Sequence, residues 1–181
     1  VIKSLGFAGN HKTEMDMIIN EHGFREDFPV EVLEEMNNIS STISDEEIGK
    51  REDFRDILTI AIDPDNCKDR DDSISFNKLP NGNIELGVHI ADVSHYVKKD
   101  SELYNEAKER SYSIYLVDRV IPMLPEKLSN NICSLNKNSD KLSFSFIFTL
   151  NKEYSVIKRR FVKGIVKMDE ALSYEEAQKM I

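Results

Sequence analysis

The sequence predicts a mixed α/β (α+β) fold, in which a largely antiparallel sheet carries flanking helices. Residues 142–150 alternate between large apolar and mostly small polar side chains, with the period of two that is typical of a strand. Residues 80–83 read Pro-Asn-Gly-Asn and separate two strand-like segments, as the turn of a hairpin does. Ser173, with Glu176 three positions later, forms a capping box, which predicts that a helix begins there.

The first fifty residues are expected to form a strand followed by a helical linker. Residues 1–6 alternate like a strand with no partner before it, so we expect the last strand of a preceding domain. Thr13 and the acidic residue three positions later predict the start of a short helix, which Gly23 ends. Pro29 marks the start of a second helix.

The strands of the sheet are predicted from residue 51 onwards. Residues 57–62 are almost entirely apolar, which predicts a strand that is buried on both faces. Residues 101–110 have the spacing of a helix. The other predicted strands are residues 73–76, residues 84–90, residues 142–150 with one aromatic face, and residues 154–168.

Size and composition limit the classes of protein to which the chain can belong. Its 181 residues fit one domain, or one domain with a short appendage, and 40% of them are hydrophobic, as in globular proteins. The longest apolar run is too short to span a bilayer, so no membrane partner is expected. Cys67 and Cys133 are the two cysteines, which fits a reducing compartment and leads us to expect a cytoplasmic protein.

Several motifs that would indicate other chemistries are missing from the sequence. It has no CxxC, HExxH, GxxxxGK, GxGxxG or GxSxG pattern. Zinc chemistry, ATP hydrolysis by a P-loop, dinucleotide binding and a hydrolase nucleophile elbow therefore have no local support. The 33 acidic residues outnumber the 24 basic ones, for a net charge of −9, which argues against a protein that coats nucleic acid through charge alone.

A dense acidic loop is the strongest indication of chemistry in the sequence. The apolar segment at residues 57–62 leads into ten residues that hold five carboxylates: Asp63, Asp65, Asp69, Asp71 and Asp72. Adjacent carboxylates repel one another, so each must either bind a proton or lie near a cation. Oxygen ligands without histidine or cysteine favour Mg²⁺, Mn²⁺ or Ca²⁺ over zinc.

Three interpretations of this loop compete. The first is a solvated acidic loop without a ligand. The second is a calcium-binding EF-hand, but Lys68 stands where the loop needs glycine and Ile74 where it needs a bidentate glutamate. The third is a site for phosphoryl transfer with divalent cations, in which several carboxylates converge on one point.

The motifs around the loop resemble the catalytic (RNB) domain of the ribonuclease II and ribonuclease R family. They are IDP at residues 62–64, KDRDD at 68–72, GVHIADVS at 87–94, YLVDRVIPMLP at 115–125 and LSNNICSL at 128–135. All of them occur in the family's order, and the VDRVIPMLP run is closer to ribonuclease R than to ribonuclease II. Arg70 and Cys67 depart from the family pattern, which has an apolar residue and an alanine there.

The resemblance implies a processive 3′→5′ exoribonuclease. Such an enzyme hydrolyses single-stranded RNA to nucleoside 5′-monophosphates with Mg²⁺, or with Mn²⁺ as the alternative. The family's catalytic and metal-binding residues fall on Asp63, Asp69, Asp71 and Asp72, whereas Asp65 lies at a position that the family motif leaves open.

Two tyrosines are implied to bind RNA. Tyr115 matches a family aromatic residue that stacks on a base near the RNA 3′ end, and such stacking contributes about 1–3 kcal/mol per base. Tyr174 lies near a family tyrosine that is associated with recognition of the ribose. His89, by contrast, is expected to be a structural, hydrogen-bonded histidine, and Asp92 is expected to hold a loop and not a metal ion.

The resemblance also predicts how the chain is organised. Residues 51–181 match the N-terminal half of an RNB catalytic domain, and residues 1–50 would be the last strand of a cold-shock domain plus a helical linker. We expect little exonuclease activity from this piece alone, and exposed apolar surface that favours self-association. Two other functions stay open: a catalytically inactive RNB-type RNA-binding protein, and a metal-binding or interaction module.

Overall fold

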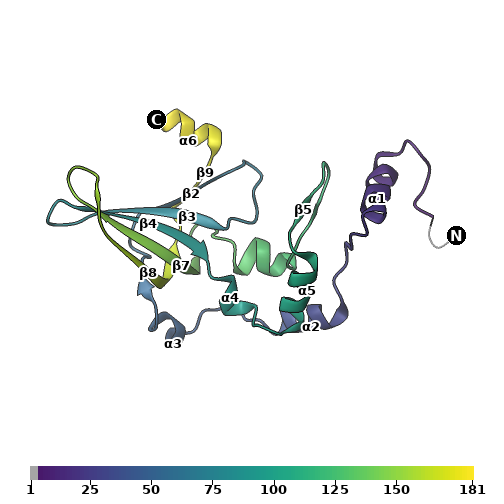
Figure 1. Ribbon diagram of the computed structural model, residues 1–181, viewed down its shortest axis with the longest axis horizontal. Helices are drawn as coiled ribbons and strands as arrows, with labels where there is room; N and C mark the ends of the chain where they lie inside the picture. Colours follow the sequence, from purple (N-terminus) through teal and green to yellow (C-terminus); the bar gives the residue numbers. More distant parts are fainter. Residues whose placement is uncertain (1–3) are drawn as a thin grey trace.

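A seven-stranded sheet in the order β1-β8-β7-β4-β3-β2-β9 is the central element of the computed structural model, which describes residues 4–181 (Figure 1). Its strands are β1 (Glu52–Asp53), β2 (Thr59–Asp63), β3 (Asp72–Lys78), β4 (Ile84–Ala91), β7 (Asp140–Leu150), β8 (Val156–Lys167) and β9 (Glu170–Ser173). The four central pairings are antiparallel, and only the two edge strands, β1 and β9, pair in parallel. The predicted mixed, largely antiparallel sheet is confirmed.

Seven helical segments accompany the sheet. They are α1 (His11–Glu21), α2 (Val30–Asn37), α3 (Asp45–Ile48), α4 (Val93–Tyr96), α5 (Glu102–Arg110), the π-helix η1 (Lys127–Ile132) and α6 (Tyr174–Met180). A small separate hairpin is formed by β5 (Ile114–Tyr115) and β6 (Val120–Ile121). In Figure 1, α2, α5 and η1 lie together beside the sheet, α6 lies beyond β9, and α1 lies at the far end.

Two of the predicted N-cap residues can be compared with the N-caps that the structure shows. Ser173 and Glu176 form the capping box of α6 as predicted. The predicted cap of α1 was wrong: the N-cap is Asn10, three positions before Thr13, and its side chain accepts from the backbone N–H groups of Lys12 and Thr13. Either residue type can cap a helix, so the choice depends on the path of the chain before it. Residues 1–3 of the predicted first strand lie outside the described residues, and residues 4–6 belong to no strand.

The burial of the two faces of the sheet differs from the prediction. We expected β2 to be buried on both faces, but only its Thr59 and Ala61 side chains are buried, whereas Ile62 on the other face is 39% exposed. The predicted aromatic face of β7 exists, yet it is the more exposed one, because its serines point into the core and Phe144 points outward. The strand pattern fixed which residues share a face but not which face is covered.

The outer face is an apolar surface that crosses five strands. One row of paired residues runs across β2, β3, β4, β7 and β8, and its members are Ile60, Ile74, Val88, Phe146 and Phe161. Phe146 and Phe161 stack with their ring centroids 4.1 Å apart, and Phe161 is still 65% exposed. Apolar surface of this kind favours association, so self-association stays a prediction.

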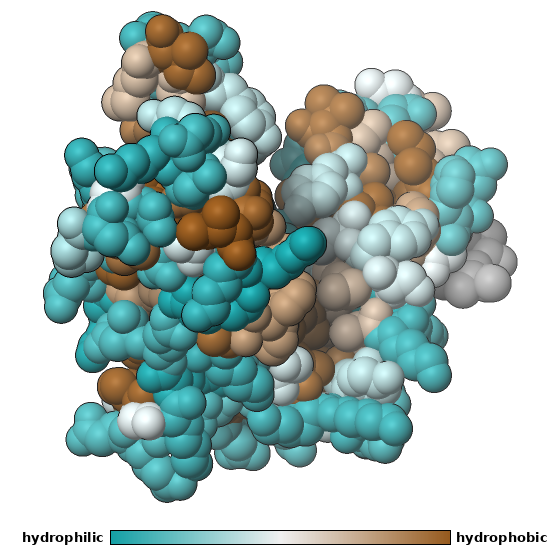
Figure 2. All heavy atoms as spheres, turned by 60° about the vertical axis from the view of Figure 1, so that its left-hand side comes forward, coloured by the Kyte–Doolittle hydropathy of each residue, from teal (hydrophilic) through white to brown (hydrophobic). Residues whose placement is uncertain are grey.

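The inner face packs against helices and forms the core. Leu103 of α5 and Leu128 of η1 are fully buried and join Ile147 of β7 in one apolar cluster with Val32 of α2. With the left-hand side of Figure 1 turned forward, apolar patches interrupt a mainly hydrophilic surface that is hollowed between its upper parts (Figure 2). None of the helices in residues 4–181 has the length and apolar character needed to cross a bilayer.

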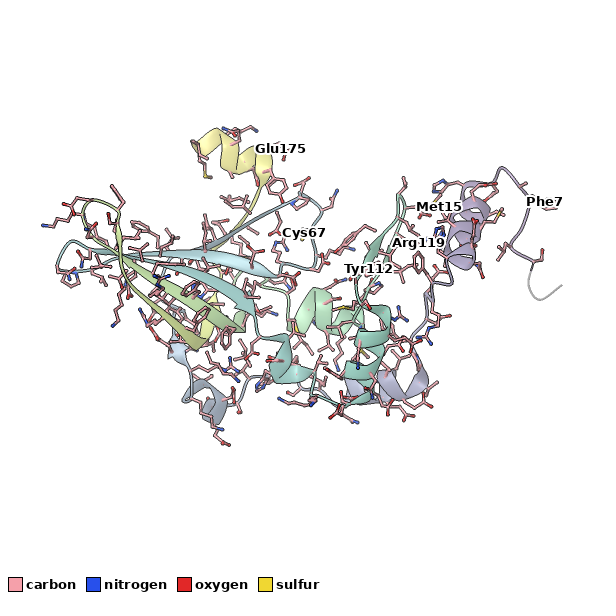
Figure 3. The ribbon with its side chains drawn as sticks, in the orientation of Figure 1. Phe7, Met15, Cys67, Tyr112, Arg119 and Glu175 are labelled. Atoms are coloured by element: carbon pink, nitrogen blue, oxygen red, sulfur yellow. The ribbon has the colours of Figure 1, made fainter. Side chains whose placement is uncertain are left out.

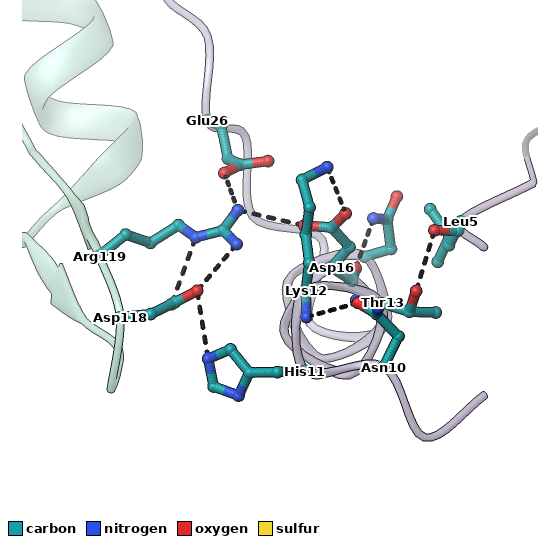
Figure 4. A network of polar contacts seen from close by, with 10 residues as sticks. Leu5, Asn10, His11, Lys12, Thr13, Asp16, Glu26, Asp118 and Arg119 are labelled. Carbon is teal, nitrogen blue, oxygen red and sulfur yellow. Dashed lines mark hydrogen bonds and ion pairs between the residues drawn. The ribbon is translucent and has the colours of Figure 1, made fainter. Parts of the chain in front are cut away.

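Ion pairs fasten the N-terminal segment to the hairpin of β5 and β6 (Figure 4). Arg119, at the tip of the hairpin, contacts Asp16 of α1 at 3.1 Å and Glu26 at 2.9 Å. Asp118 beside it contacts both Arg119, at 3.0 Å, and His11, at 3.4 Å. Single exposed ion pairs add little stability, but a network that shares one guanidinium restricts the hairpin more strongly.

Candidate active site

The acidic loop connects β2 to β3 at one edge of a cavity. Asp63 is the last residue of β2 and Asp72 the first residue of β3, so the strands hold both ends of the loop. Asp63 and Asp69 line a cavity of about 700 Å³, together with Tyr115 and Asn130 from other parts of the chain. Figure 3 labels Cys67 in this loop and Arg119 on the neighbouring hairpin, and both residues line the same cavity.

In the acidic loop, the charges of three carboxylates act on a fourth, that of Asp71. The pKa of Asp71 is raised, first because surrounding protein partly displaces water, although the residue is exposed, and then because of the charges of Asp69, Asp72 and Asp63. Asp63, Asp69 and Asp72 thus lie near enough to Asp71 for their charges to raise its pKa, and the role of these four residues stays a prediction. Asp65 does not contribute to this effect and lies exposed in the loop.

The arginine within the loop neutralises only one of these charges. Arg70 Nε lies 3.8 Å from Asp63 Oδ2. Both atoms are buried, and neither has a hydrogen-bond partner among the described residues. A buried polar atom without a partner costs free energy, so Asp63 Oδ2 is well suited to bind a cation.

This donor set fits a hard divalent cation in its chemistry. Asp63, Asp69, Asp71 and Asp72 offer only oxygen atoms, which Mg²⁺ and Mn²⁺ prefer. Within residues 4–181, no three acidic, histidine or cysteine side chains already surround one point at metal-binding distance. The residue types present therefore fit such a cation, and Asp63, Asp69, Asp71 and Asp72 are the residues that would hold it.

Tyr115 makes a contact that the sequence did not predict. Its hydroxyl donates to Asp69 Oδ2 at 2.7 Å. This hydrogen bond, more than burial, raises the pKa of Tyr115 to about 12. The residue is 66% exposed, so its ring is accessible from the solvent and its predicted stacking on a base stays a prediction. The two residues are 46 positions apart in the chain, and no local pattern connects them.

Tyr174 also lies near the acidic loop. It is the first residue of α6, and the residue before it, Ser173, pairs with Asp63 where β9 lies beside β2. The side chain is 57% exposed. Its predicted contact with ribose is compatible with this position and stays a prediction.

The expected structural residues are enclosed by hydrogen bonds. His89 lies between the hydroxyls of Ser145, at 2.7 Å, and Ser75, at 2.8 Å. Burial lowers its pKa to about 4, so the ring is neutral near pH 7. Asp92 accepts from Arg51 and from the Ser94 hydroxyl, both at 2.7 Å, so it holds the chain after β4.

Comparison with known proteins identifies the family. Residues 51–181 match the model of the RNB domain. Ribonuclease R of Thermotoga maritima is 40% identical over 183 aligned residues, which cover 100% of this chain and 26% of that protein.

Solved structures share the fold. Ribonuclease R of Mycoplasma genitalium, in complex with ribose-methylated single-stranded RNA, superimposes with a TM-score of 0.87 at 30% identity, over 97% of this chain and 27% of that one. Yeast Ssd1, described as a pseudonuclease, has a TM-score of 0.82 over 98% of this chain and 23% of that one, but at 19% identity it shows the fold alone. The chain spans about a quarter of the length of these proteins. It belongs to the RNB-domain family, to which ribonuclease R belongs.

Proposed function

We propose that the protein carrying this chain is a processive 3′→5′ exoribonuclease that hydrolyses single-stranded RNA to nucleoside 5′-monophosphates with Mg²⁺. The observation that carries the proposal is the crowding of four carboxylates beside a cavity, which raises the pKa of Asp71. Membership of the RNB-domain family supports it. Residues 51–181 would supply the first half of the catalytic domain, and residues 1–50 a linker from a cold-shock domain.

In this proposal the aspartates would hold the cation, and through it the scissile phosphate. A divalent cation bound there supplies Lewis-acid stabilisation of the reacting phosphate and lowers the pKa of a bound water molecule. Asp63 is held by β2 and Asp72 by β3, so two of the carboxylates come from rigid strand ends. Asp69 and Asp71 lie between them and are placed by the loop.

The tyrosines would place the RNA. The exposed ring of Tyr115 offers a face to any base, which suits an enzyme that degrades RNA of any sequence. Tyr174, beside Asp63 through the pairing of β9 with β2, would contact the ribose of the terminal nucleotide. Free Cys67 and Cys133 support a cytoplasmic location.

A second candidate is an RNB-type protein that binds RNA without cleaving it. The fold is compatible with this candidate, since Ssd1, described as a pseudonuclease, shares it. Four clustered carboxylates count against it, because a binding surface gains nothing from keeping their mutual repulsion near a polyanion.

Nucleotide release by the full-length protein separates the two candidates. With Mg²⁺ we expect release of nucleoside 5′-monophosphates from single-stranded RNA, and with EDTA we expect none. Asp71→Asn should lower the rate at least about a hundredfold while RNA binding persists, since it removes a carboxylate that would hold the catalytic cation. Asp65→Asn is the matched control from the same loop and should keep the rate. RNA binding without nucleotide release by the wild-type protein would refute the proposal in favour of the second candidate.

A further inference from the structure

The segment that follows η1 holds the acidic loop on both sides of Asp69. Ser134 Oγ donates to the Lys68 carbonyl at 2.8 Å and accepts from the Arg70 N–H at 3.0 Å. The next residue, Leu135, donates its backbone N–H to the Arg70 carbonyl at 2.9 Å. The loop is therefore tied to a part of the chain that follows it much later in sequence.

These hydrogen bonds fix the backbone at Asp69. The Lys68 carbonyl belongs to the peptide group before Asp69, and the Arg70 N–H belongs to the peptide group after it. Because peptide groups are planar, only the φ and ψ angles of Asp69 lie between them. One hydroxyl that bonds to both groups therefore sets the direction in which the Asp69 side chain leaves the backbone.

Ser134 itself stands on rigid support. It is 1% exposed, and its neighbours Cys133 and Leu135 belong to the apolar core. The buried Lys141 ammonium donates to the Ile132 carbonyl at 3.3 Å and also to the Asn131 carbonyl, which fastens the end of η1. Because movement of Ser134 would disturb this close packing, Ser134 is the fixed partner in its hydrogen bonds with the acidic loop.

The carboxylate of Asp69 is oriented separately. Tyr115 donates to its Oδ2 at 2.7 Å, and the Cys67 thiol donates to its Oδ1 at 3.6 Å. These side chains determine how the carboxylate is rotated. Ser134 instead sets the direction in which the Asp69 side chain leaves the backbone, and no other described side chain bonds to both peptide groups.

We propose that Ser134 is a positioning residue for the divalent cation: by fixing both peptide groups around Asp69, it keeps that carboxylate directed toward Asp63, Asp71 and Asp72. The inference rests on the proposed function and deepens it. Groups that orient metal ligands without touching the metal typically change its affinity 10- to 100-fold when they are removed.

The test uses the full-length protein that carries this chain, with Mn²⁺ as the probe and electron paramagnetic resonance as the readout. Ser134→Ala is expected to weaken Mn²⁺ binding about 10- to 100-fold, while RNA affinity measured in EDTA stays unchanged. Ser134→Thr keeps the hydroxyl and should restore the affinity. Ser101→Ala is the matched control, because Ser101 caps α5 by accepting from the Tyr104 N–H, away from the loop, and its loss should leave Mn²⁺ binding intact.

The outcomes separate the inference from the proposed function. If Ser134→Ala lowers the thermal midpoint but binds Mn²⁺ like the wild type, the role of Ser134 is only structural and the inference is overturned. If Ser134→Ala does not fold, Ser134→Cys replaces the hydroxyl by a weakly bonding thiol of similar size, and wild-type Mn²⁺ affinity in that variant would overturn the inference. Absence of Mn²⁺ binding in the wild type would overturn the proposed function as well.

Discussion

Asp71 precedes β3 and Asp92 follows β4, at the same end of these neighbouring strands, and the pKa values of the two carboxyl groups shift in opposite directions. The Ala91 N–H, at the end of β4, donates to the Asp71 carbonyl at 2.9 Å, so Asp71 and Asp92 are near neighbours in the sheet. Burial alone would raise the pKa of Asp92, but hydrogen bonds from Ser94 and Arg51 outweigh it and lower that pKa. The pKa of Asp71 is raised instead, by partial burial and three other carboxylates.

This difference in charge partners distinguishes a structural carboxylate from the carboxylates that bind a cation in our proposal. Arg51 is fully buried and reaches Asp92, Glu47 and two backbone carbonyls, so each charge in that group has a partner within the protein. In the acidic loop, Asp63 is the one described carboxylate with which Arg70 forms an ion pair, and the distance is 3.8 Å. We therefore expect loss of a partner to destabilise the first group and addition of a cation to stabilise the second.

The largest expected effect comes from breaking the buried pair. Arg51→Met leaves Asp92 buried without its guanidinium and should lower the free energy of unfolding by about 3–5 kcal/mol. Arg55→Met is the control, because Arg55 pairs with Asp53 and Asp140 at the surface and should cost less than about 1 kcal/mol. Urea unfolding of both variants measures the difference. Equal losses in both variants would contradict the structural role assigned to Asp92.

His89 extends the comparison to a buried group that stays neutral. The ordinary pKa of histidine is 6.5 and that of His89 is about 4, so between these values only the unfolded chain binds the proton. The free energy of unfolding should therefore fall as the pH falls from 6.5 to 4, by up to about 3 kcal/mol for this residue. His89→Gln can still bond to Ser75 and Ser145 but cannot titrate. Unfolding measured across this range should show a flatter pH dependence for the variant, and an identical dependence would rule the explanation out.

Tyr115 sharpens the comparison on the side of the acidic loop. Its ring and its hydroxyl have separate roles in this account, since the ring faces solvent and the hydroxyl bonds to Asp69. Tyr115→Ala should weaken RNA binding in EDTA by about 1–3 kcal/mol through lost stacking. Tyr115→Phe keeps the ring and should bind RNA like the wild type. If both variants lost the same RNA affinity, the hydroxyl and not the ring would hold the RNA.

Local patterns in the sequence predicted turns and helix starts better than they predicted which face of a strand is buried. The hairpin turn with Gly82 and the capping box at Ser173 depend on neighbouring residues, and both are present. The covered face of β7 was not predictable, because its serines are buried beside His89 in a polar network that spans three strands. An alternating pattern does not show that a serine face will be the buried one.

The same limit applies to the site. The acidic loop was recognisable because its five carboxylates lie within ten residues of sequence after an apolar segment, and the resemblance to the RNB family selected four of them. The contacts of Asp69 with Tyr115, and of the loop backbone with Ser134, join segments that only the folded chain brings together. A lone serine or tyrosine carries no signal of such a contact, since both residue types serve many local roles.

One substitution tests the central claim that the crowded aspartates are completed by a divalent cation. In EDTA, Asp71→Asn removes a charge that three neighbours repel, so the full-length variant should be more stable than the wild type, by less than about 1 kcal/mol. With Mg²⁺ the wild type should gain stability, about 2.7 kcal/mol at a hundred times the dissociation constant, and overtake the variant. Thermal unfolding of both proteins in the two conditions should therefore show their order of stability reversed. An order that is the same with and without Mg²⁺ would contradict the account.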